Sequence, residues 1–319
     1  MAQHFLMSAA ARTLSLKAIF ADGEAAAYRR FCALRWPETN GAPICPECRC
    51  IEAYSITSRR RFKCAACHHQ FSVTSGTIFA SRKLCFADLL SAICLFVNAS
   101  KGMSAVQFSR DLNVQYKTAF VLMHKLREAM AAETADARLG NTVEVDGAYF
   151  GGYVRPANFK EDRVDRRLLR NRTGKRRVVV VLRERGGRTL TRAFLREAEG
   201  VRFAKERIEA GSIVAADEVA HWDLLTSTFK TQRINHSDAY SRDGIHTNMA
   251  ESFFSRLRRM IRGQHHAVGS KHLGGYAIHA AWLEDHRLVS NGGLADRLIA
   301  DALSAPVSRA WKGYWQGAA

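Results

Sequence analysis

The chain has 319 residues, 47% of them hydrophobic, and carries a formal net charge of +18 with a pI near 10.0. This composition excludes a disordered chain and predicts two or three globular domains that bind a polyanion, most often nucleic acid. No apolar run approaches the length of a membrane span, and residues 1–6 lack the charged head of a signal peptide, so we expect a cytoplasmic protein without a membrane partner.

Residues 1–40 predict a helical lead-in. Apolar residues between Leu14 and Tyr28 recur at helical spacing, and Trp36-Pro37 ends the run because proline cannot continue a helix. This segment carries no catalytic signal.

Residues 41–79 predict a zinc ribbon, because four of the eight cysteines form two CxxC pairs with fifteen residues between the pairs. These cysteines are Cys45, Cys48, Cys64 and Cys67. Thiolates at this spacing predict one structural Zn²⁺ ion, which holds together a segment too small for a core of its own. Buried or disulfide-bonded cysteines are the alternative, and Cys50, His68 and His69 are competing ligands.

Residues 80–131 predict a helical DNA-binding domain. Residues 84–98 are apolar nearly all round and predict a buried helix. Ala105 to Leu112, a turn at Asn113-Val114 and a helix from Tyr116 to Met130 resemble a helix-turn-helix. The second of these helices carries the cations Lys117, Lys125 and Arg127. A plain helical hairpin is the alternative, and residues 131–141 predict a linker.

From residue 142 the pattern changes to strands that alternate with helices. The expected strands are Val143 to Tyr149, Arg176 to Glu184, Arg188 to Phe194, Ser212 to Ala216 and Arg233 to His236. The expected helices are Phe203 to Ala210, Val219 to Phe229 and Thr247 to Ile261, the last capped by Thr247 or Asn248. This order predicts an α/β, RNase H-like core with a mixed sheet over residues 142–288.

Three acidic residues are expected to converge on this sheet. Asp146 lies in the first strand, where an unpaired buried charge is costly, Asp217 ends the fourth strand, and Glu251 lies near the start of the closing helix. Such a set can hold two hard cations about 3.5–4 Å apart, and oxygen ligands favour Mg²⁺ or Mn²⁺ over zinc. Taken one at a time, each carboxylate also fits a turn residue or a surface charge.

The third position has two candidates. Asn248 precedes Glu251 by three residues, so both lie on one helical face, and the amide is a second ligand, a helix cap or a substrate contact. Arg258 follows on the same face, and with Arg256 and Arg259 it predicts a basic edge suited to phosphates.

The residues around these acids resemble a known family. The run from Val145 to Gly152, the triplet Ala216-Asp217-Glu218 and the run from His246 to Arg259 resemble the signature of DDE transposases from bacterial insertion sequences. The resemblance is closest to the group in which a zinc ribbon and a helix-turn-helix precede the DDE core, and it covers roughly residues 25–285.

The resemblance implies an RNase H-like fold, Mg²⁺-dependent strand cleavage and strand transfer at terminal inverted repeats, and a homodimer or larger synaptic complex on nucleoid DNA. It assigns Asp146 and Asp217 as the first two catalytic residues and Asn248 or Glu251 as the third. The sequence departs from the family at Arg258, where lysine is common, and at His221-Trp222, where tyrosine is expected. If a tyrosine ring matters there, the departure puts activity in doubt.

Positive charge is concentrated in residues 155–177, which hold ten Lys or Arg and three acidic residues. We expect this loop to order on DNA because its cations neutralise phosphates, although a solvated, mobile loop is the more ordinary outcome. The predicted DNA contacts are Lys117, Lys125, Arg127, Arg166, Arg167, Arg170, Lys175, Arg176, Arg256, Arg258 and Arg259. The C-terminal tail, residues 289–319, packs on the core or binds another protomer.

Two other functions share these sequence features. A zinc-ribbon regulator with an inactive RNase H-like half would bind DNA without cutting it. An RNase H-type nuclease would hydrolyse strands without joining them, and the same acids serve both chemistries.

Overall fold

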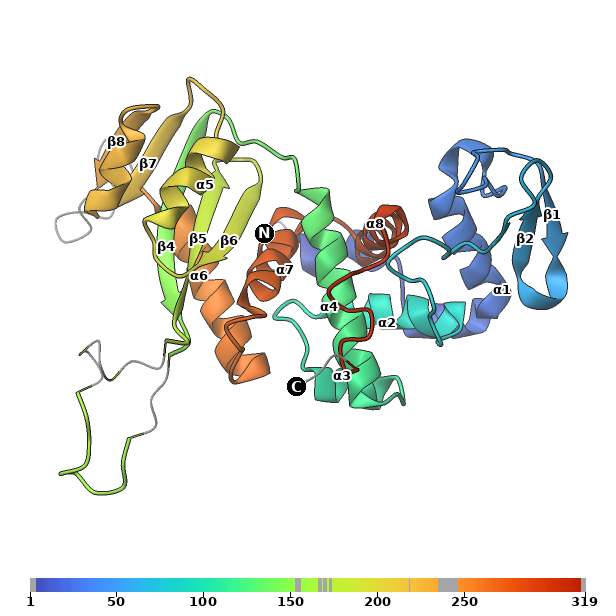
Figure 1. The fold of residues 1–319 in the computed structure, drawn as a ribbon, viewed down its shortest axis with the longest axis horizontal. Helices are drawn as coiled ribbons and strands as arrows, with labels where there is room; N and C mark the ends of the chain where they lie inside the picture. The colour runs from blue at the N-terminus through green and yellow to red at the C-terminus, as the bar shows by residue number, and fades with distance from the viewer. Residues whose placement is uncertain are drawn as a thin grey trace. The chain divides into compact units, whose positions relative to one another are not determined.

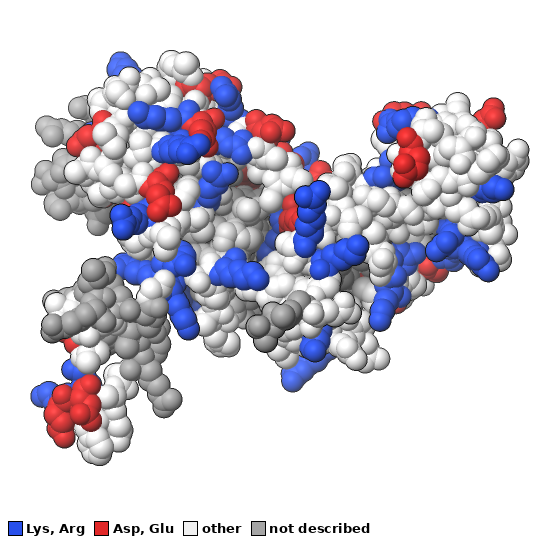
Figure 2. All heavy atoms as spheres, viewed as in Figure 1, with Lys and Arg blue, Asp and Glu red and all other residues white. Residues whose placement is uncertain are grey.

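The computed structural model describes residues 4–152, 156–165, 168, 171, 174–217, 219–234 and 246–316. Two compact units divide the chain, one formed by Met1–Glu133 with His286–Ala319 and the other by Thr134–Asp285 (Figure 1). None of the described helices is both long enough and apolar enough to cross a membrane. Lys and Arg side chains lie on the visible surface of both units (Figure 2).

The first unit begins with helix α1 (Leu16–Arg35), which matches the predicted lead-in. The Ser15 hydroxyl accepts from the Ala18 N–H and caps its start, and Gly23, at φ +75°, kinks it. Short 3₁₀ helices precede α1 at Phe5–Met7 and Ala9–Ala11, and two others follow it at Pro37–Thr39 and Thr57–Arg59.

The ribbon is a three-stranded antiparallel sheet in the order β1 (Ala53–Ile56), β2 (Arg61–Cys64) and β3 (Gln70–Phe71). All three strands lie within residues 41–79, and β3 spans two residues, too short to leave a periodic pattern. Trp36 contacts Phe62 and Phe71 edge to face, so the end of α1 packs on the ribbon.

Four further helices complete the first unit. The predicted apolar helix is α2 (Phe86–Asn98), and the predicted hairpin is α3 (Ala105–Asp111) and α4 (Tyr116–Glu133). Helix α8 (Asn291–Ser304) follows the second unit in sequence but packs against α1, α2 and α4. The Asn291 side chain fastens it, because its oxygen accepts from the N–H groups of Thr13 and Leu14.

The second unit contains a five-stranded mixed sheet in the order β6-β5-β4-β7-β8. The strands are β4 (Thr142–Phe150), β5 (Arg177–Glu184), β6 (Thr189–Phe194), β7 (Ile213–Asp217) and β8 (Lys230–Ile234). Strand β4 pairs antiparallel with β5 and parallel with β7, and β8 extends the parallel half. The mixed sheet confirms the predicted α/β, RNase H-like class.

Helices cover both faces of this sheet. Helix α5 (Glu199–Arg207) packs on one face with Val178, Val180 and Leu182 of β5, whereas α6 (Asn248–Met260) and α7 (Leu273–Asp285) pack on the other with Val179 and Val181 (Figure 1). The unbroken apolar run of β5 is therefore that of a central strand buried on both faces.

Three predicted elements differ in extent or type. The helix expected from Val219 to Phe229 is a 3₁₀ helix, Ala220–Leu225, because its two buried residues, Trp222 and Leu225, are three apart and the next residues are Thr, Ser and Thr. Helix α5 starts and ends earlier than Phe203 to Ala210. Strand β8 starts earlier than expected, and its predicted end at Asn235-His236 lies outside the described residues. A π-helical turn, Ile261–His265, continues α6.

Candidate active site and zinc centre

The four predicted zinc ligands lie together in the ribbon. Cys45 Sγ lies 3.6 Å from Cys67 Sγ, Cys48 Sγ lies 3.5 Å from Cys64 Sγ, and all four sulfur atoms lie within 4.8 Å of one another. Thiolates about 2.3 Å from a zinc ion at the corners of a tetrahedron are roughly 3.8 Å apart, so these cysteines fit Zn²⁺.

The ribbon backbone also favours the thiolate form of one ligand. The Cys67 N–H donates to Cys64 Sγ and lowers the pKa of that thiol to about 6. The competing residue Cys50 instead donates to the Glu52 carbonyl and lies outside the four-sulfur group.

The first two predicted acids lie on neighbouring parallel strands. Val145 of β4 is paired with Ala216 of β7, so Asp146 and Asp217 stand side by side one residue further on. The residues before them, Val145 and Ala216, belong to the core on the α5 face, and strand alternation therefore directs both aspartates to the α6 face. Asp146 and Asp217 therefore lie on the same face of the sheet, as two ligands of a shared cation must.

The third candidates lie at the start of α6, on the same face of the sheet. Asn248 is the first residue of the helix and Glu251 lies in its first turn, and both are exposed. Thr247 occupies the N-cap position but makes no side-chain capping bond, so the expected cap by Thr247 or Asn248 is not formed.

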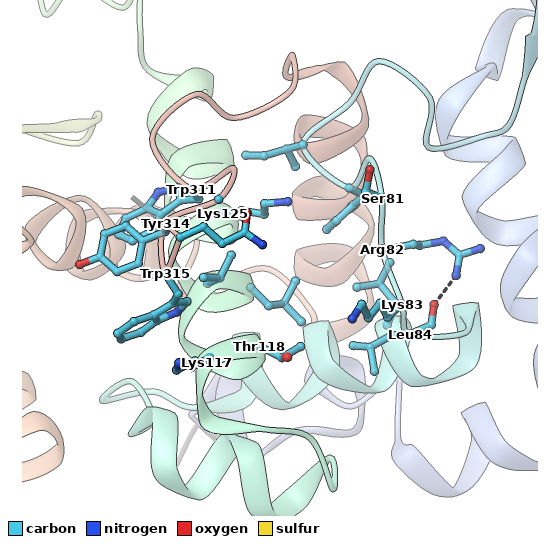
Figure 3. Close-up of a pocket in the computed structure, with 17 residues that line it drawn as sticks. Ser81, Arg82, Lys83, Leu84, Lys117, Thr118, Lys125, Trp311, Tyr314 and Trp315 are labelled. Atoms are coloured by element: carbon cyan, nitrogen blue, oxygen red, sulfur yellow. Dashed lines mark hydrogen bonds between the residues drawn. The ribbon is translucent and has the colours of Figure 1, made fainter. Parts of the chain in front are cut away.

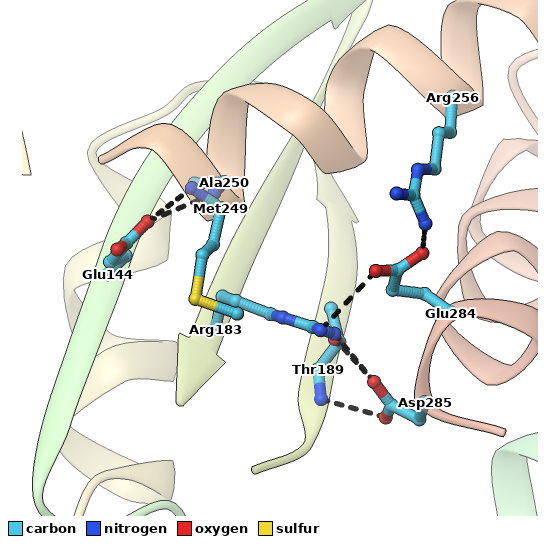
Figure 4. Close-up of polar contacts among 8 residues, drawn as sticks. All are labelled: Glu144, Arg183, Thr189, Met249, Ala250, Arg256, Glu284 and Asp285. Atoms are coloured by element: carbon cyan, nitrogen blue, oxygen red, sulfur yellow. Dashed lines mark hydrogen bonds and ion pairs between the residues drawn. The ribbon is translucent and has the colours of Figure 1, made fainter. Parts of the chain in front are cut away.

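A buried carboxylate on β4 provides the cap instead. Glu144 is fully buried, and its Oε2 accepts from the N–H groups of Met249 at 2.8 Å and Ala250 at 3.1 Å (Figure 4). Its other oxygen, Oε1, lies 3.0 Å from Arg185 Nε and 3.0 Å from His246 Nδ1. Because Glu144 is two residues before Asp146, it ties the start of α6 directly to the strand that carries the first acid.

A second polar network fastens α7 to the same sheet. Arg183 donates to Asp285 at 2.7 Å, and Asp285 also accepts from the N–H and hydroxyl of Thr189 (Figure 4). Arg256 of α6 pairs with Glu284 of α7. Helices α6 and α7 are thus held on one face of the sheet by buried charged groups as well as by their apolar contacts.

The electrostatics of Asp146 indicate a site built for positive charge. Burial, together with the negative charges of Glu197, Asp217 and Glu251, raises the pKa of Asp146 to about 7, against the lowering effect of the Gly147 N–H at 2.7 Å. A bound cation would reverse this penalty, because it stabilises the ionised carboxylate.

Glu197 is a fourth carboxylate at this site that the sequence analysis missed. A Cβ placed on Gly147 would lie 2.2 Å from Glu197 Oε1, so the carboxylate occupies space that only glycine leaves open. Burial and the charge of Asp217 raise the pKa of Glu197 to about 7. Glu197 lies in the segment between β6 and α5, where no periodic pattern distinguishes it from its neighbour Glu199.

The carboxylates are less closely gathered than the cysteines. Among the described residues, the four cysteines are the one set of three or more such ligand groups whose atoms all lie within 4.8 Å. Asp146 and Asp217 share the α6 face, whereas Glu197 lies beside Gly147 on the other face and acts on them through its charge. The oxygen donors of Asp146, Asp217 and Glu251 fit Mg²⁺ or Mn²⁺. To coordinate one metal ion together, the exposed side chain of Glu251 and the side chains of Asp146 and Asp217 would have to turn toward one another.

The residues at the expected tyrosine position occupy two environments. Trp222 is fully buried in the core on the α5 face, where it packs close to Gly200. His221 Nε2 lies 3.7 Å from Glu197 Oε1, so this imidazole faces the fourth carboxylate. Trp222 therefore contributes its ring to packing.

The predicted DNA contacts have different surroundings. Arg258 and Arg259 are exposed on α6, and Arg176 lies over the Tyr149 ring at 4.2 Å. Arg127 is only 2% exposed and lies over Phe96, which argues against a contact with DNA, because a buried guanidinium cannot reach phosphate. Of the loop residues, Lys175 is described and exposed, whereas Arg166, Arg167 and Arg170 lie outside the described residues.

Two family models match the chain. One, described as an ISXO2-like transposase domain, matches residues 138–285, which include the mixed sheet and the acidic site. The other, described as a transposase zinc-ribbon domain, matches residues 23–70, which include all four clustered cysteines. No curated protein and no solved structure matches the chain.

Proposed function

We propose that this chain, which matches a transposase zinc-ribbon domain and an ISXO2-like transposase domain, is an insertion-sequence transposase that cleaves and joins DNA strands at the ends of its element. The proposed substrate is double-stranded DNA, comprising the terminal inverted repeats and a target. The proposed assembly is a homodimer or larger synaptic complex, in which two element ends meet.

The observation that carries this proposal is the placement of Asp146 beside Asp217 on adjacent parallel strands. Both aspartates face the start of α6, which carries Asn248 and Glu251. We assign Asp146, Asp217 and Glu251 as ligands of Mg²⁺ or Mn²⁺, with Asn248 as a further ligand or a substrate contact. When bound, such ions sharpen a water or a 3′-hydroxyl as nucleophile and stabilise the leaving oxygen.

Residues outside the acidic site have supporting roles in this proposal. Glu144 holds the first turn of α6 against β4, so that Glu251 stays within reach of the aspartates. Arg258 and Arg259 extend a basic edge along the same helix, and Arg176 and Lys175 bring cations near the end of β4. Their task is to hold phosphates in register with the acids.

The test uses purified protein, Mg²⁺ and a labelled duplex with an element end. We expect strand cleavage followed by joining, and we expect Asp146→Asn or Asp217→Asn to lower the rate by about a hundredfold or more, as removal of a transition-state-stabilising group does. Asp223→Asn is the matched control, because Asp223 has a side chain that is 67% exposed and lies outside the site.

Three outcomes separate the candidate functions. Cleavage with joined products, lost in both site variants, supports a transposase. Cleavage without joining identifies a nuclease, and binding without cleavage identifies a regulator. Equal cleavage by the wild type and both site variants would remove these aspartates from the chemistry.

A further inference from the structure

A pocket of about 490 Å³ lies in the first unit, apart from the acidic site and the zinc ligands. Residues 78–84, helix α4 and the chain end around residues 311–316 form most of its wall, and Leu89 of α2 completes it. Figure 3 shows Trp311, Tyr314 and Trp315 on one side and residues 81–84 on the other, with α4 between them. A volume of this size is within the usual range of ligand sites.

The charge of the pocket has one sign. Its lining contains four cations and, among the described residues, no aspartate or glutamate. The cations are Arg82, Lys83, Lys117 and Lys125. Arg82 turns its guanidinium over the Phe86 ring at 3.6 Å and donates to the Leu84 carbonyl, which leaves the three lysines as the groups best placed to meet an anion.

Aromatic rings form the opposite wall. Trp311 stacks on His124 with centroids 4.3 Å apart, Phe120 contacts all three aromatic side chains of the wall, and Tyr314 meets Trp315 edge to face at 5.1 Å. Trp315 is 44% exposed although it is a large apolar side chain. An exposed tryptophan that is fixed by other rings provides a flat stacking surface at little conformational cost.

A lysine already lies next to that surface. Lys117 Nζ is 5.5 Å from the centre of the Trp315 ring, so a cation and an aromatic face are presented together. Desolvation lowers the pKa of Lys125, which indicates a partly dehydrated ammonium whose charge an anion would stabilise. Adjacent cations and stacking rings are what a nucleotide requires, because its phosphate takes the cation and its base takes the ring.

We propose that this pocket is a second DNA site, which holds an unstacked nucleotide with its base on Trp315 and its phosphates on Lys117, Lys125 and Lys83. The proposal rests on the proposed function, in so far as DNA is the substrate. It specifies an unpaired nucleotide because a base in an intact duplex presents only its edges, and its π-face becomes available once it leaves the stack. Recognition by stacking and charge is tolerant of sequence.

The experiment titrates the full-length protein with three probes and follows tryptophan fluorescence. The probes are a short oligothymidylate, a blunt duplex, and the same duplex with an unpaired 3′ overhang. We expect quenching by the oligothymidylate and by the overhang, and protection of the quenched tryptophan from acrylamide. Trp315→Ala should weaken binding of these two probes about tenfold, within the range of single base-stacking losses, and should leave the blunt duplex unaffected.

Matched variants control for general effects. Tyr54→Ala removes another exposed aromatic side chain of the same unit, and Lys101→Ala removes an exposed lysine outside the pocket, so both should bind as the wild type does. Lys117→Ala with Lys125→Ala should reduce the salt dependence of oligothymidylate binding. If Trp315→Ala fails to fold, acrylamide protection in the wild type still decides the question.

Two results with Trp315→Ala would overturn the proposal: an unchanged affinity for oligothymidylate, or an equal loss of affinity for the blunt duplex. Free access of acrylamide to the tryptophan in the wild-type complex would also overturn it. The titrations are repeated with Asp146→Asn, which lacks the proposed catalytic acid but keeps the pocket. In the wild type, absent cleavage with intact pocket binding would refute the transposase chemistry alone, and active cleavage without pocket binding would refute the pocket alone.

Discussion

At the residue scale, Glu144 and Asp146 are both carboxylates on β4, but their charges have different surroundings. Glu144 is compensated by two helix N–H groups and an arginine. Asp146 accepts from the Gly147 N–H, but burial and the negative charges of nearby carboxylates penalise its ionised form. We therefore assign Glu144 a structural role in fixing α6 on β4, and we expect Asp146 to be stabilised in its ionised form by a bound cation.

The raised pKa of Asp146 predicts a dependence of stability on pH. Because its folded pKa of about 7 exceeds the unfolded value of about 3.9, the neutral form is favoured on folding, and stability is lost as pH rises from 4 through 7. In the absence of divalent ions, the free energy of unfolding of Asp146→Asn should therefore be about 1–3 kcal/mol higher than that of the wild type at pH 8. The two proteins should differ little at pH 4.

Urea unfolding at both pH values measures this effect. Glu197, whose pKa is also raised to about 7, contributes in the same direction but is more accessible to solvent, so the variant should retain a weak pH dependence. Mg²⁺ should stabilise the wild type more at pH 8 than at pH 5. A variant that is less stable than the wild type at pH 8 would contradict the assignment.

At the element scale, α6 is held at its first turn by a side chain from another element. Its own residues supply no N-cap bond, and the carboxylate of Glu144 from β4 accepts the two free N–H groups. A helix capped from the sheet has a fixed register against that sheet. Glu251 and Asn248, both in this turn, thus take their positions from Glu144.

We predict that Glu144→Ala destabilises the second unit by about 3–5 kcal/mol, the usual cost of removing one member of a buried ion pair. The loss of the ion pair with Arg185 adds to the loss of the cap. Chemical denaturation measures the change. Glu206→Ala is the control, because Glu206 forms an exposed pair with Arg202 and its removal should leave stability unchanged. Equal effects of the two variants would reject the capping role.

The zinc ribbon is the other element whose fold depends on a few side chains. Its three strands are two to four residues long, too short to stabilise a sheet without the ion. Cys64→Ser or treatment with a strong chelator should remove zinc and expose the ribbon to proteolysis. Cys50→Ser should keep one zinc per chain, since Cys50 lies outside the four-sulfur group. Full zinc content in Cys64→Ser, measured by elemental analysis, would refute the ligand assignment.

At the scale of the whole molecule, the chain returns to its first unit after completing the second. Helix α8 buries Leu294, Leu298, Ile299 and Leu303 among α1, α2 and α4, and Ser308 donates to Glu128 of α4. The chain end thereby reaches the pocket beside Lys117 and Lys125. The second unit is thus an insertion between two parts of the first, and the predicted separate tail of residues 289–319 belongs with the helices of the first unit.

The sequence by itself determined the four clustered cysteines, most of the strands and helices of the second unit, and the positions of Asp146 and Asp217 on its strands. These features are local, because CxxC spacing, strand alternation and motif residues are all read along a short run of chain. The burial of Arg127 could not be predicted for the same reason, since a cation on a helix gives no sign of whether its face is covered.

Only the tertiary structure decided the role of Glu144, the presence of Glu197 and the pocket around Trp315. Each depends on residues far apart in sequence: Glu144 of β4 accepts from Met249 and Ala250 of α6, and Glu197 fits beside Gly147. The tail aromatics reach α4 because α8 packs there. Burial and contact arise from packing, which no periodicity in the chain records.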